Sequence, residues 1–372
     1  MRALIAMGEW PSITSTKRLA AFNAARVLEA LYATGPSSAL DVAARTGLSR
    51  PATDKALHGL VKSELVQQYN APRDTPGRPT AIYEFDRGRG AVVAVDIGPH
   101  TARARVDPLT GPALGQRHEV VHVRLGMTRS TPTPERLGLV DEVVTEALAA
   151  ADTRREQVWA IVAATPGIID DTGSITRCEV IDSWHADVLR THLTTRFPQA
   201  TIVVENDVNA AAVAEYVHGG AAGRDEVAVV HAGARVGMGL LRGGELYRGA
   251  HGQAGEFAHV QGTPWRKAND ALLTAGTPVG PERLDHVAGA LAVALRELVF
   301  AVDPELVVLA GPLARTGEGL LEAVRRHVPE GFPTLPDLAL SPVGPADVLL
   351  GTAELARRRA MERILREVAE RL

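Results

Sequence analysis

Carboxylates, amides and glycines gather directly after several apolar runs of this 372-residue chain. Asn206 and Asp207 follow the apolar run 201–204, while Glu256 and His259 end a glycine-rich stretch. Carboxylates in such places accept hydrogen bonds or protons from hydroxyl groups, and glycine-rich turns let backbone N–H groups approach a phosphate. A plainer interpretation of Asn206 and Asp207 is the capped start of a helix. The junctions concerned are Asp96–Gly98, Glu205–Ala212, His231–Gly239, Ala310–Pro312 and Tyr247–His259.

The elements that would hold these residues alternate along the chain beyond residue 90. Short apolar runs typical of buried strands are separated by stretches with helical periodicity, and this alternation predicts an α/β architecture. The expected strands are 91–96, 159–164, 201–204, 227–231 and 306–310. The expected helices are 135–151, 207–218, 285–302 and 350–372, the last with arginine and glutamate pairs on its exposed side.

Residues 39–66 carry a different signal, the pattern of a helix-turn-helix motif. Gly47 provides the turn, Ser49 is expected to cap the second helix, and Pro51 fits its first turn. One face of that helix is expected to pack, through Thr53, Ala56, Leu57 and Leu60. The other face would be free for a DNA major groove, and its predicted contacts are Ser49, Arg50, Pro51, Asp54, Lys55 and His58. A short helical hairpin without a DNA role is the alternative.

The segment 67–85 predicts a β-hairpin wing, with 81–85 as its returning strand. A Gly-Arg-Pro turn at its tip holds one arginine away from the backbone, a shape suited to a narrow minor groove. The tip residues expected to contact DNA are Arg73, Gly77, Arg78 and Pro79. The distribution of charge also favours DNA binding by this part of the chain. Residues 17–90 contain 11 Lys and Arg against 7 Asp and Glu, whereas the whole chain has a net charge of −4. A basic head on an acidic body is expected where only the head meets nucleic acid.

Composition narrows the class of protein. The 45% hydrophobic and 23% charged residues are ordinary for a globular protein. We find no apolar run of about 18 residues and no signal-peptide pattern, so a cytoplasmic protein without a membrane segment is expected. The one cysteine, Cys178, excludes an intrachain disulfide and a multi-cysteine zinc site, and is expected to be a small, half-buried side chain.

The motifs together are similar to those of the ROK family, which comprises repressors and sugar kinases. The similarity covers roughly residues 17–372 and is carried by the stretch 205–212, ENDVNAAA, and the stretch 246–259, LYRGAHGQAGEFAH. It implies a two-lobed, actin-like (ribonuclease H-like) ATPase fold. A winged helix with a Gly-Arg-Pro wing ahead of this body resembles the family's transcriptional repressors, because its kinases lack that head.

The resemblance divides the chain into three parts. Residues 1–16 are expected to form an N-terminal arm, and residues 17–86 a winged helix-turn-helix DNA-binding domain. Residues 87–372 would form the sugar-kinase-like body, which binds a ligand and dimerises. The C-terminal helix of this body is expected to pack back on the first of its two lobes.

The resemblance also implies a sugar site. Asn206, Asp207, Glu256 and His259 occupy positions that contact sugar hydroxyls in the family, and Asp207 would be the general base of a kinase. The family's zinc motif has three cysteines after this histidine, whereas residues 260–276 contain none. No metal is therefore expected.

The two loops that hold ATP phosphates in the family's kinases are altered in this chain. Pro99 removes a backbone N–H from the first loop, and Ala234 and Arg235 replace a threonine and a glycine of the second. We therefore expect no kinase activity and no cofactor. Arg235 is expected either to form a salt bridge with Asp96 or Asp207, or to bind an anionic ligand such as a sugar phosphate.

The sequence thus predicts a DNA-binding transcriptional regulator, in the simplest case a repressor, whose body senses a sugar or a sugar phosphate. Its partners would be a double-stranded operator with an inverted repeat and further copies of the chain, in a homodimer or a tetramer. Ligand binding would release or re-space the DNA-binding heads. Two alternatives are an ATP-dependent sugar kinase with Asp207 as general base, and a regulator whose body only dimerises.

Overall fold

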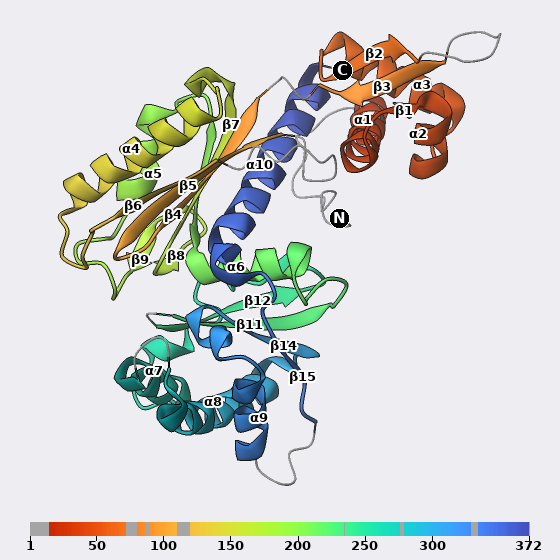
Figure 1. Ribbon diagram of the computed structural model, residues 1–372. Coiled ribbons are helices and arrows are strands. Elements are labelled where there is room, and N and C mark those ends of the chain that lie inside the picture. The colour runs from red at the N-terminus through yellow and green to blue at the C-terminus, as the bar shows by residue number, and fades with distance from the viewer. Residues whose placement is uncertain are drawn as a thin grey trace.

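The computed structural model describes residues 15–71, 80–86, 90–109, 120–233, 235–275, 279–328 and 334–371. Figure 1 shows a small N-terminal head, two larger lobes, and a long C-terminal helix, α10 (Asp347–Arg371), that runs from the junction of the lobes to the head. Within these ranges, no helix is long and apolar enough to span a bilayer.

The head combines helices with a small antiparallel sheet in the strand order β1-β3-β2. Its elements are α1 (Ser15–Thr34), β1 (Ser37–Ser38), α2 (Ala39–Thr46), α3 (Arg50–Lys62), β2 (Val66–Asn70) and β3 (Ala81–Phe85). The predicted helix-turn-helix corresponds to α2 and α3, and the predicted hairpin to β2 and β3. Both predictions are confirmed.

Local sequence explains the ends of α2 and the start of α3. Ser38 and Asp41 form a capping box, in which the Asp41 N–H donates to Ser38 Oγ at 3.2 Å and the Ser38 N–H donates to Asp41 Oδ2 at 3.3 Å. Gly47 ends α2 with a φ of 64°, which glycine adopts without steric cost. Ser49 occupies the N-cap position of α3 as predicted, but its side chain makes no capping hydrogen bond.

The first lobe is built on a mixed sheet with the strand order β10-β7-β4-β5-β6. Side chains alternate along β4, so that Val93 and Val95 face α4 and α5 while Val92 and Ala94 face α10. The elements are β4 (Ala91–Ile97), β5 (Thr101–Pro108), β6 (Val120–Leu125), α4 (Thr133–Ala150), η3 (Arg155–Gln157), β7 (Val158–Thr165), β8 (Ile168–Ile169), β9 (Ile175–Arg177), α5 (Val188–Arg196) and β10 (Thr201–Asn206).

The second lobe has a sheet in the order β13-β12-β11-β14-β15, with α7, α8 and α9 on one face and α6 on the other. Gly237 and Gly239 of β12 permit this close packing, since a Cβ on Gly239 would lie 2.7 Å from the Cβ of Ala212 on α6. The elements are α6 (Asp207–His218), β11 (Glu226–Ala232), β12 (Val236–Arg242), β13 (Glu245–Leu246), η4 (Phe257–His259), α7 (Pro264–Ala275), α8 (Pro281–Val302), β14 (Leu306–Ala310), η5 (Pro312–Thr316), α9 (Glu318–His327), β15 (Asp337–Leu340) and η6 (Gly344–Ala346).

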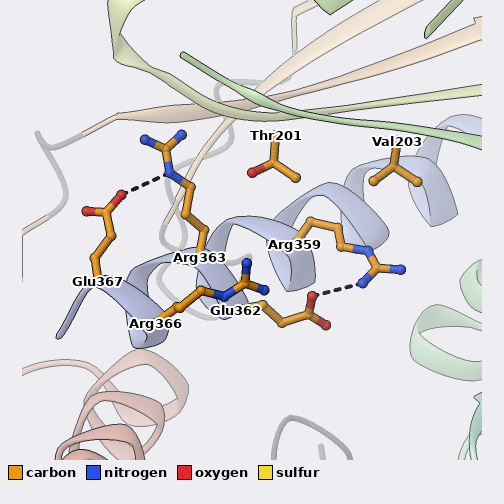
Figure 2. Close-up of a pocket in the computed structure, with 7 residues that line it drawn as sticks. All are labelled: Thr201, Val203, Arg359, Glu362, Arg363, Arg366 and Glu367. Atoms are coloured by element: carbon orange, nitrogen blue, oxygen red, sulfur yellow. Dashed lines mark hydrogen bonds and ion pairs between the residues drawn. The ribbon is translucent and has the colours of Figure 1, made fainter. Parts of the chain in front are cut away.

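The helix α10 connects these parts. It packs against β4 and β7 of the first lobe, against α6, and against α1 of the head. Its exposed side pairs arginine with glutamate, as predicted. Figure 2 shows Arg359 paired with Glu362 and Arg363 paired with Glu367, beside β10. The N···O distances in these pairs are 2.9 Å and 3.0 Å. The groove here, of about 390 Å³, is thus a solvated helix face whose charges largely compensate one another.

Candidate functional site

The exposed face of α3 is the first candidate site. The predicted packing residues Thr53, Ala56, Leu57 and Leu60 are buried, and the predicted DNA contacts on this helix and its cap are all exposed. Arg50 Nε lies 3.1 Å from Asp54 Oδ1, one helical turn away. Such an exposed pair is worth only about 0.3–0.5 kcal/mol. Arg50 can therefore leave it at little cost to contact a base or a phosphate.

The wing contacts are a separate matter, because Arg73, Gly77, Arg78 and Pro79 lie outside the described residues. The strands that carry the tip are in place, and their pairing runs from Val66 with Phe85 to Asn70 with Ala81. The role of the tip residues stays a prediction.

The second candidate site is a cavity of about 130 Å³ at the start of α6. Strand β10 of the first lobe runs directly into α6, which packs on the second lobe, so this junction brings side chains of both lobes together. The structure gathers all of the residues predicted for the ligand site around this cavity: Asn206, Asp207, Arg235, Glu256 and His259.

Asn206 is the N-cap of α6. Its Oδ1 accepts the N–H groups of Val208 at 2.8 Å and Asn209 at 3.0 Å, which confirms the plainer interpretation of this residue. Its Nδ2 donates to the Gly167 carbonyl at 2.9 Å and lies 3.4 Å from Glu256 Oε1. Capping and cavity contact are therefore compatible, because the cap fixes the amide beside Glu256.

Asp207 is the first residue of α6 and is surrounded by other ionisable groups. Burial raises the pKa of Asp207 to about 7, and the charges of Asp96 and Glu256 act in the same direction, whereas His231 opposes them. Asp207 therefore exchanges its proton close to neutral pH. Such a group can either donate to a ligand hydroxyl or accept from one.

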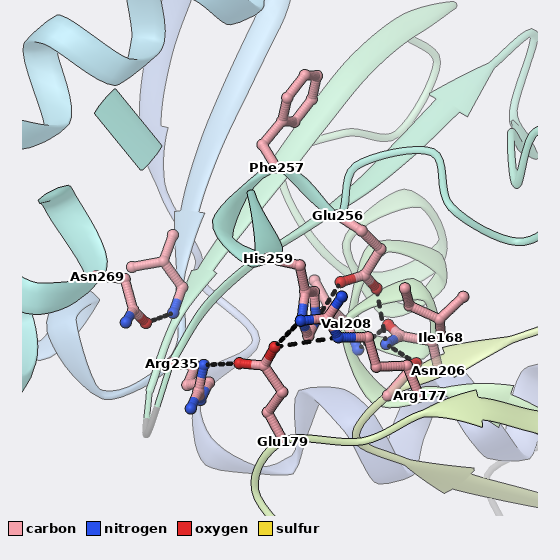
Figure 3. A network of polar contacts seen from close by, with 12 residues as sticks. Ile168, Arg177, Glu179, Asn206, Val208, Arg235, Glu256, Phe257, His259 and Asn269 are labelled. Carbon is pink, nitrogen blue, oxygen red and sulfur yellow. Dashed lines mark hydrogen bonds and ion pairs between the residues drawn. The ribbon is translucent and has the colours of Figure 1, made fainter. Parts of the chain in front are cut away.

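His259 lies between two carboxylates, as Figure 3 shows. Its Nε2 is 3.1 Å from Glu256 Oε2, and its Nδ1 is 3.1 Å from Glu179 Oε1. The hydrogen bond with Glu256 raises the pKa of His259; burial opposes this rise and Glu179 adds to it. Because only the imidazolium carries a proton on both ring nitrogens, this arrangement favours the charged ring.

Arg235 forms a salt bridge, but with a different partner from those predicted. Its Nη1 lies 2.6 Å from Glu179 Oε2, whereas Asp96 accepts a hydrogen bond of 2.7 Å from Arg103 Nε. The prediction of Asp96 or Asp207 as the partner was therefore wrong. The reason is positional: Arg235 precedes β12 and meets the loop after β9, where Glu179 lies.

Sequence reasoning missed Glu179, and it missed the pair formed by His231 and Asp347. His231 Nε2 lies 3.3 Å from Asp347 Oδ2, at the start of α10. Burial disfavours the charged imidazole, but the hydrogen bond with Asp347 and the charges of Asp347, Asp207 and Asp96 together outweigh it, and the pKa of His231 is raised. A histidine at the end of the expected strand 227–231 was an available signal. Glu179 and Asp347 follow no strand that is recognisable in the sequence, so the residues around them gave no signal of a site.

A further cavity of about 340 Å³ adjoins Asp207 on the side of Gly311 and Asp347. Gly98 of the first glycine junction lines this cavity, but its N–H donates to the Thr101 carbonyl at 2.8 Å within a turn. Pro99 lines the smaller cavity. Ala234 lies outside the described residues.

The remaining expectations concern a metal and the cysteine. Across the described ranges, no group of three or more His, Cys, Asp or Glu side chains is arranged to hold a metal ion. Cys178 is half-buried as predicted, and burial raises the pKa of its thiol.

Comparison with known proteins identifies both parts of the chain. A ROK family model matches residues 92–270, and a model of the IclR helix-turn-helix domain matches residues 20–69. The crystal structure of a ROK family transcriptional regulator, a homologue of the E. coli MLC protein, superimposes with a TM-score of 0.69 over 95% of this chain and 99% of that chain, at 16% identity. The predicted fold, a winged helix-turn-helix followed by a two-lobed actin-like body, is thereby confirmed.

Curated relatives include both regulators and enzymes. The xylose repressor of Bacillus spizizenii is 22% identical over a match that covers 64% of this chain and 60% of that protein. The glucokinase of Streptomyces coelicolor is 24% identical, with 72% of this chain and 98% of the enzyme covered. In another of the curated relatives the match spans only about half of the relative's length, 49%.

Proposed function

The chain carries a ROK family domain over residues 92–270, behind an IclR-type helix-turn-helix domain over residues 20–69, and on this premise we propose that it is a DNA-binding, sugar-sensing transcriptional repressor. One observation carries the proposal: a helix with an exposed polar face and a cavity lined by carboxylates and an amide occur in the same chain. The relative named as a xylose repressor supports repression as the form of regulation.

On the DNA side, α3 would enter a major groove through its exposed face. Arg50 and His58 would reach base edges, and Lys55 would reach a phosphate. A homodimer, or a tetramer built from such dimers, would present two copies of α3 related by a two-fold axis. The operator would then be an inverted repeat.

On the ligand side, Asn206, Asp207, Glu256 and His259 would contact the hydroxyl groups of a sugar. Carboxylate oxygens accept hydrogen bonds from vicinal hydroxyls, and a ligand that lacks one hydroxyl leaves a buried polar group unpaired. The cavity is therefore expected to discriminate among sugars by the positions of their hydroxyl groups.

The alternative, a sugar kinase, is favoured by one specific observation. The pKa of Asp207 near 7 is suited to a general base at neutral pH. Against it, Pro99 lacks an N–H for a phosphate oxygen, and Arg235 occupies a glycine position of the second phosphate loop. We therefore propose that the cleft binds its ligand without phosphorylating it. ATP turnover over a panel of sugars that disappears in Asp207→Ala would assign the protein to the kinases instead.

The repressor proposal is tested by DNA binding and its response to sugars. The full chain is expected to retard specific fragments of a genomic library, and one or more sugars should release them. Arg50→Ala is expected to weaken the specific retardation. Arg296→Ala, which removes an exposed arginine on α8 remote from the head, is the matched control. Retardation that survives removal of residues 15–86 would overturn the proposal.

A further inference from the structure

A carboxylate of the first lobe meets a cluster of cations of the second lobe beside the ligand cavity. Glu179, in the loop after β9, has its Oε2 at 2.6 Å from Arg235 Nη1 and at 3.8 Å from Arg266 Nη1. Its Oε1 lies 3.1 Å from His259 Nδ1. Arg177, on β9 itself, adds a contact of 2.5 Å from its Nη2 to Glu179 Oε1. Figure 3 shows Glu179 at the centre of this network.

The cations around Glu179 form the type of site that binds anions. Two guanidiniums that converge on one point recognise carboxylates and phosphates through charge-assisted hydrogen bonds. Arg235 and Arg266 have only 26% and 22% of their side chains exposed, so they are held in place by their surroundings. Here the chain supplies the anion itself.

Glu179 stays charged in this setting. Its burial would raise the pKa of the carboxyl group, but hydrogen bonds from His259 and Arg177 and the charge of Arg235 lower the pKa of Glu179 to about 2. The carboxylate therefore competes with any acidic group of a ligand at neutral pH. Glu256 and Asp207 line the same cavity and add further negative charge.

We propose that Glu179 determines specificity in the cleft: as a built-in anion it takes the place on Arg235 and Arg266 where an acidic ligand group would bind, and it reserves the cavity for uncharged, hydroxyl-rich ligands. Glu179 is also a positioning residue for His259, which it contacts from the opposite lobe. The proposal rests on the proposed function in one respect only, the identification of this cavity as the ligand site.

The test removes the charge of Glu179 and keeps the shape of its side chain. Glu179→Gln is expected to create a binding site for inorganic phosphate, with an affinity at least about tenfold above that of the wild type, as measured by calorimetry and by thermal shift. Glu362→Gln, which removes a carboxylate from an exposed pair with Arg359, is the matched control and should gain no phosphate affinity. The double variant Glu179→Gln with Arg235→Ala should lose the gain.

A second measurement tests whether Glu179 positions His259. In ¹H–¹³C spectra, with the His259 resonance assigned from His259→Gln, the imidazole should titrate at lower pH in Glu179→Gln than in the wild type. Equal phosphate affinity in the two proteins, or an unchanged His259 titration, would overturn the proposal. If the variant does not fold, phosphate is titrated into the wild-type protein instead. A phosphate-dependent shift of the His259 resonance would then contradict the proposal that Glu179 occupies the anion site, and the absence of a shift would support it. Failure of the proposed ligand site would appear separately, as absent sugar binding by the wild type in the same calorimetry.

Discussion

Replacement of Asp207 by asparagine should stabilise the protein, and the gain should depend on pH. A rise of the Asp207 pKa from the ordinary 3.8 to about 7 corresponds to a loss of about 4 kcal/mol of unfolding free energy, at about 1.4 kcal/mol per pH unit. This is an upper limit, because Asp207 is half-buried and His231 compensates part of its charge. The native state holds the proton more tightly than the unfolded chain, so stability falls as pH rises from about 4 to about 7. Asp207→Asn removes that loss.

The assay is denaturant unfolding of both proteins at pH 5, 6, 7 and 8, followed by tryptophan fluorescence. The advantage of Asp207→Asn should grow with pH and level off above about pH 7. Asp54→Asn, the same change on the exposed face of α3, should stay within about 0.5 kcal/mol of the wild type. A stability difference for Asp207→Asn that is constant over this range would refute the reasoning, because the carboxyl group would then titrate outside it.

The remaining predictions concern the DNA contacts and the metal. Arg50→Ala should weaken operator binding by about 1–3 kcal/mol if Arg50 reads a base edge, whereas Lys55→Ala should lower affinity evenly across sequences; gel shifts with specific and scrambled fragments separate the two. Arg78→Ala should lose a preference for A·T-rich flanks while the core site is still recognised, and wild-type affinity that ignores the flanks would contradict this. Elemental analysis should find far less than one zinc per chain. Stoichiometric zinc in the wild type that is lost in His259→Ala would contradict this prediction.

Elements with strong periodicity were predictable from the sequence. Helix α6 and strand β14 have the predicted bounds, 207–218 and 306–310, and β4 ends one residue beyond the prediction. Strand β12 was missed because Gly237 and Gly239, which allow α6 to approach, interrupt its apolar run. The strands β8 and β9 were missed because they are too short to show a period.

The residues of the candidate site were likewise predictable only in part. Asn206, Asp207, Glu256 and His259 belong to recognisable motifs, and the structure brings them to one cavity. Glu179 belongs to no motif. Its importance arises only when the two lobes meet and place it against Arg235 and His259, which follow it by more than fifty positions in the chain. A single sequence contains no local trace of such a contact.

The contact between α10 and the head has a consequence for how this protein can be divided. Leu28 and Leu31 of α1 share one apolar core with Met361 and Ile364 of α10. At its other end the same helix begins with Asp347, which lines the larger cavity of the cleft. Residues 15–86 expressed alone would expose the apolar face that α10 now covers, and would lose a share of their stability with it. A minimal DNA-binding fragment would therefore have to supply α10 as well, for example as a linked peptide.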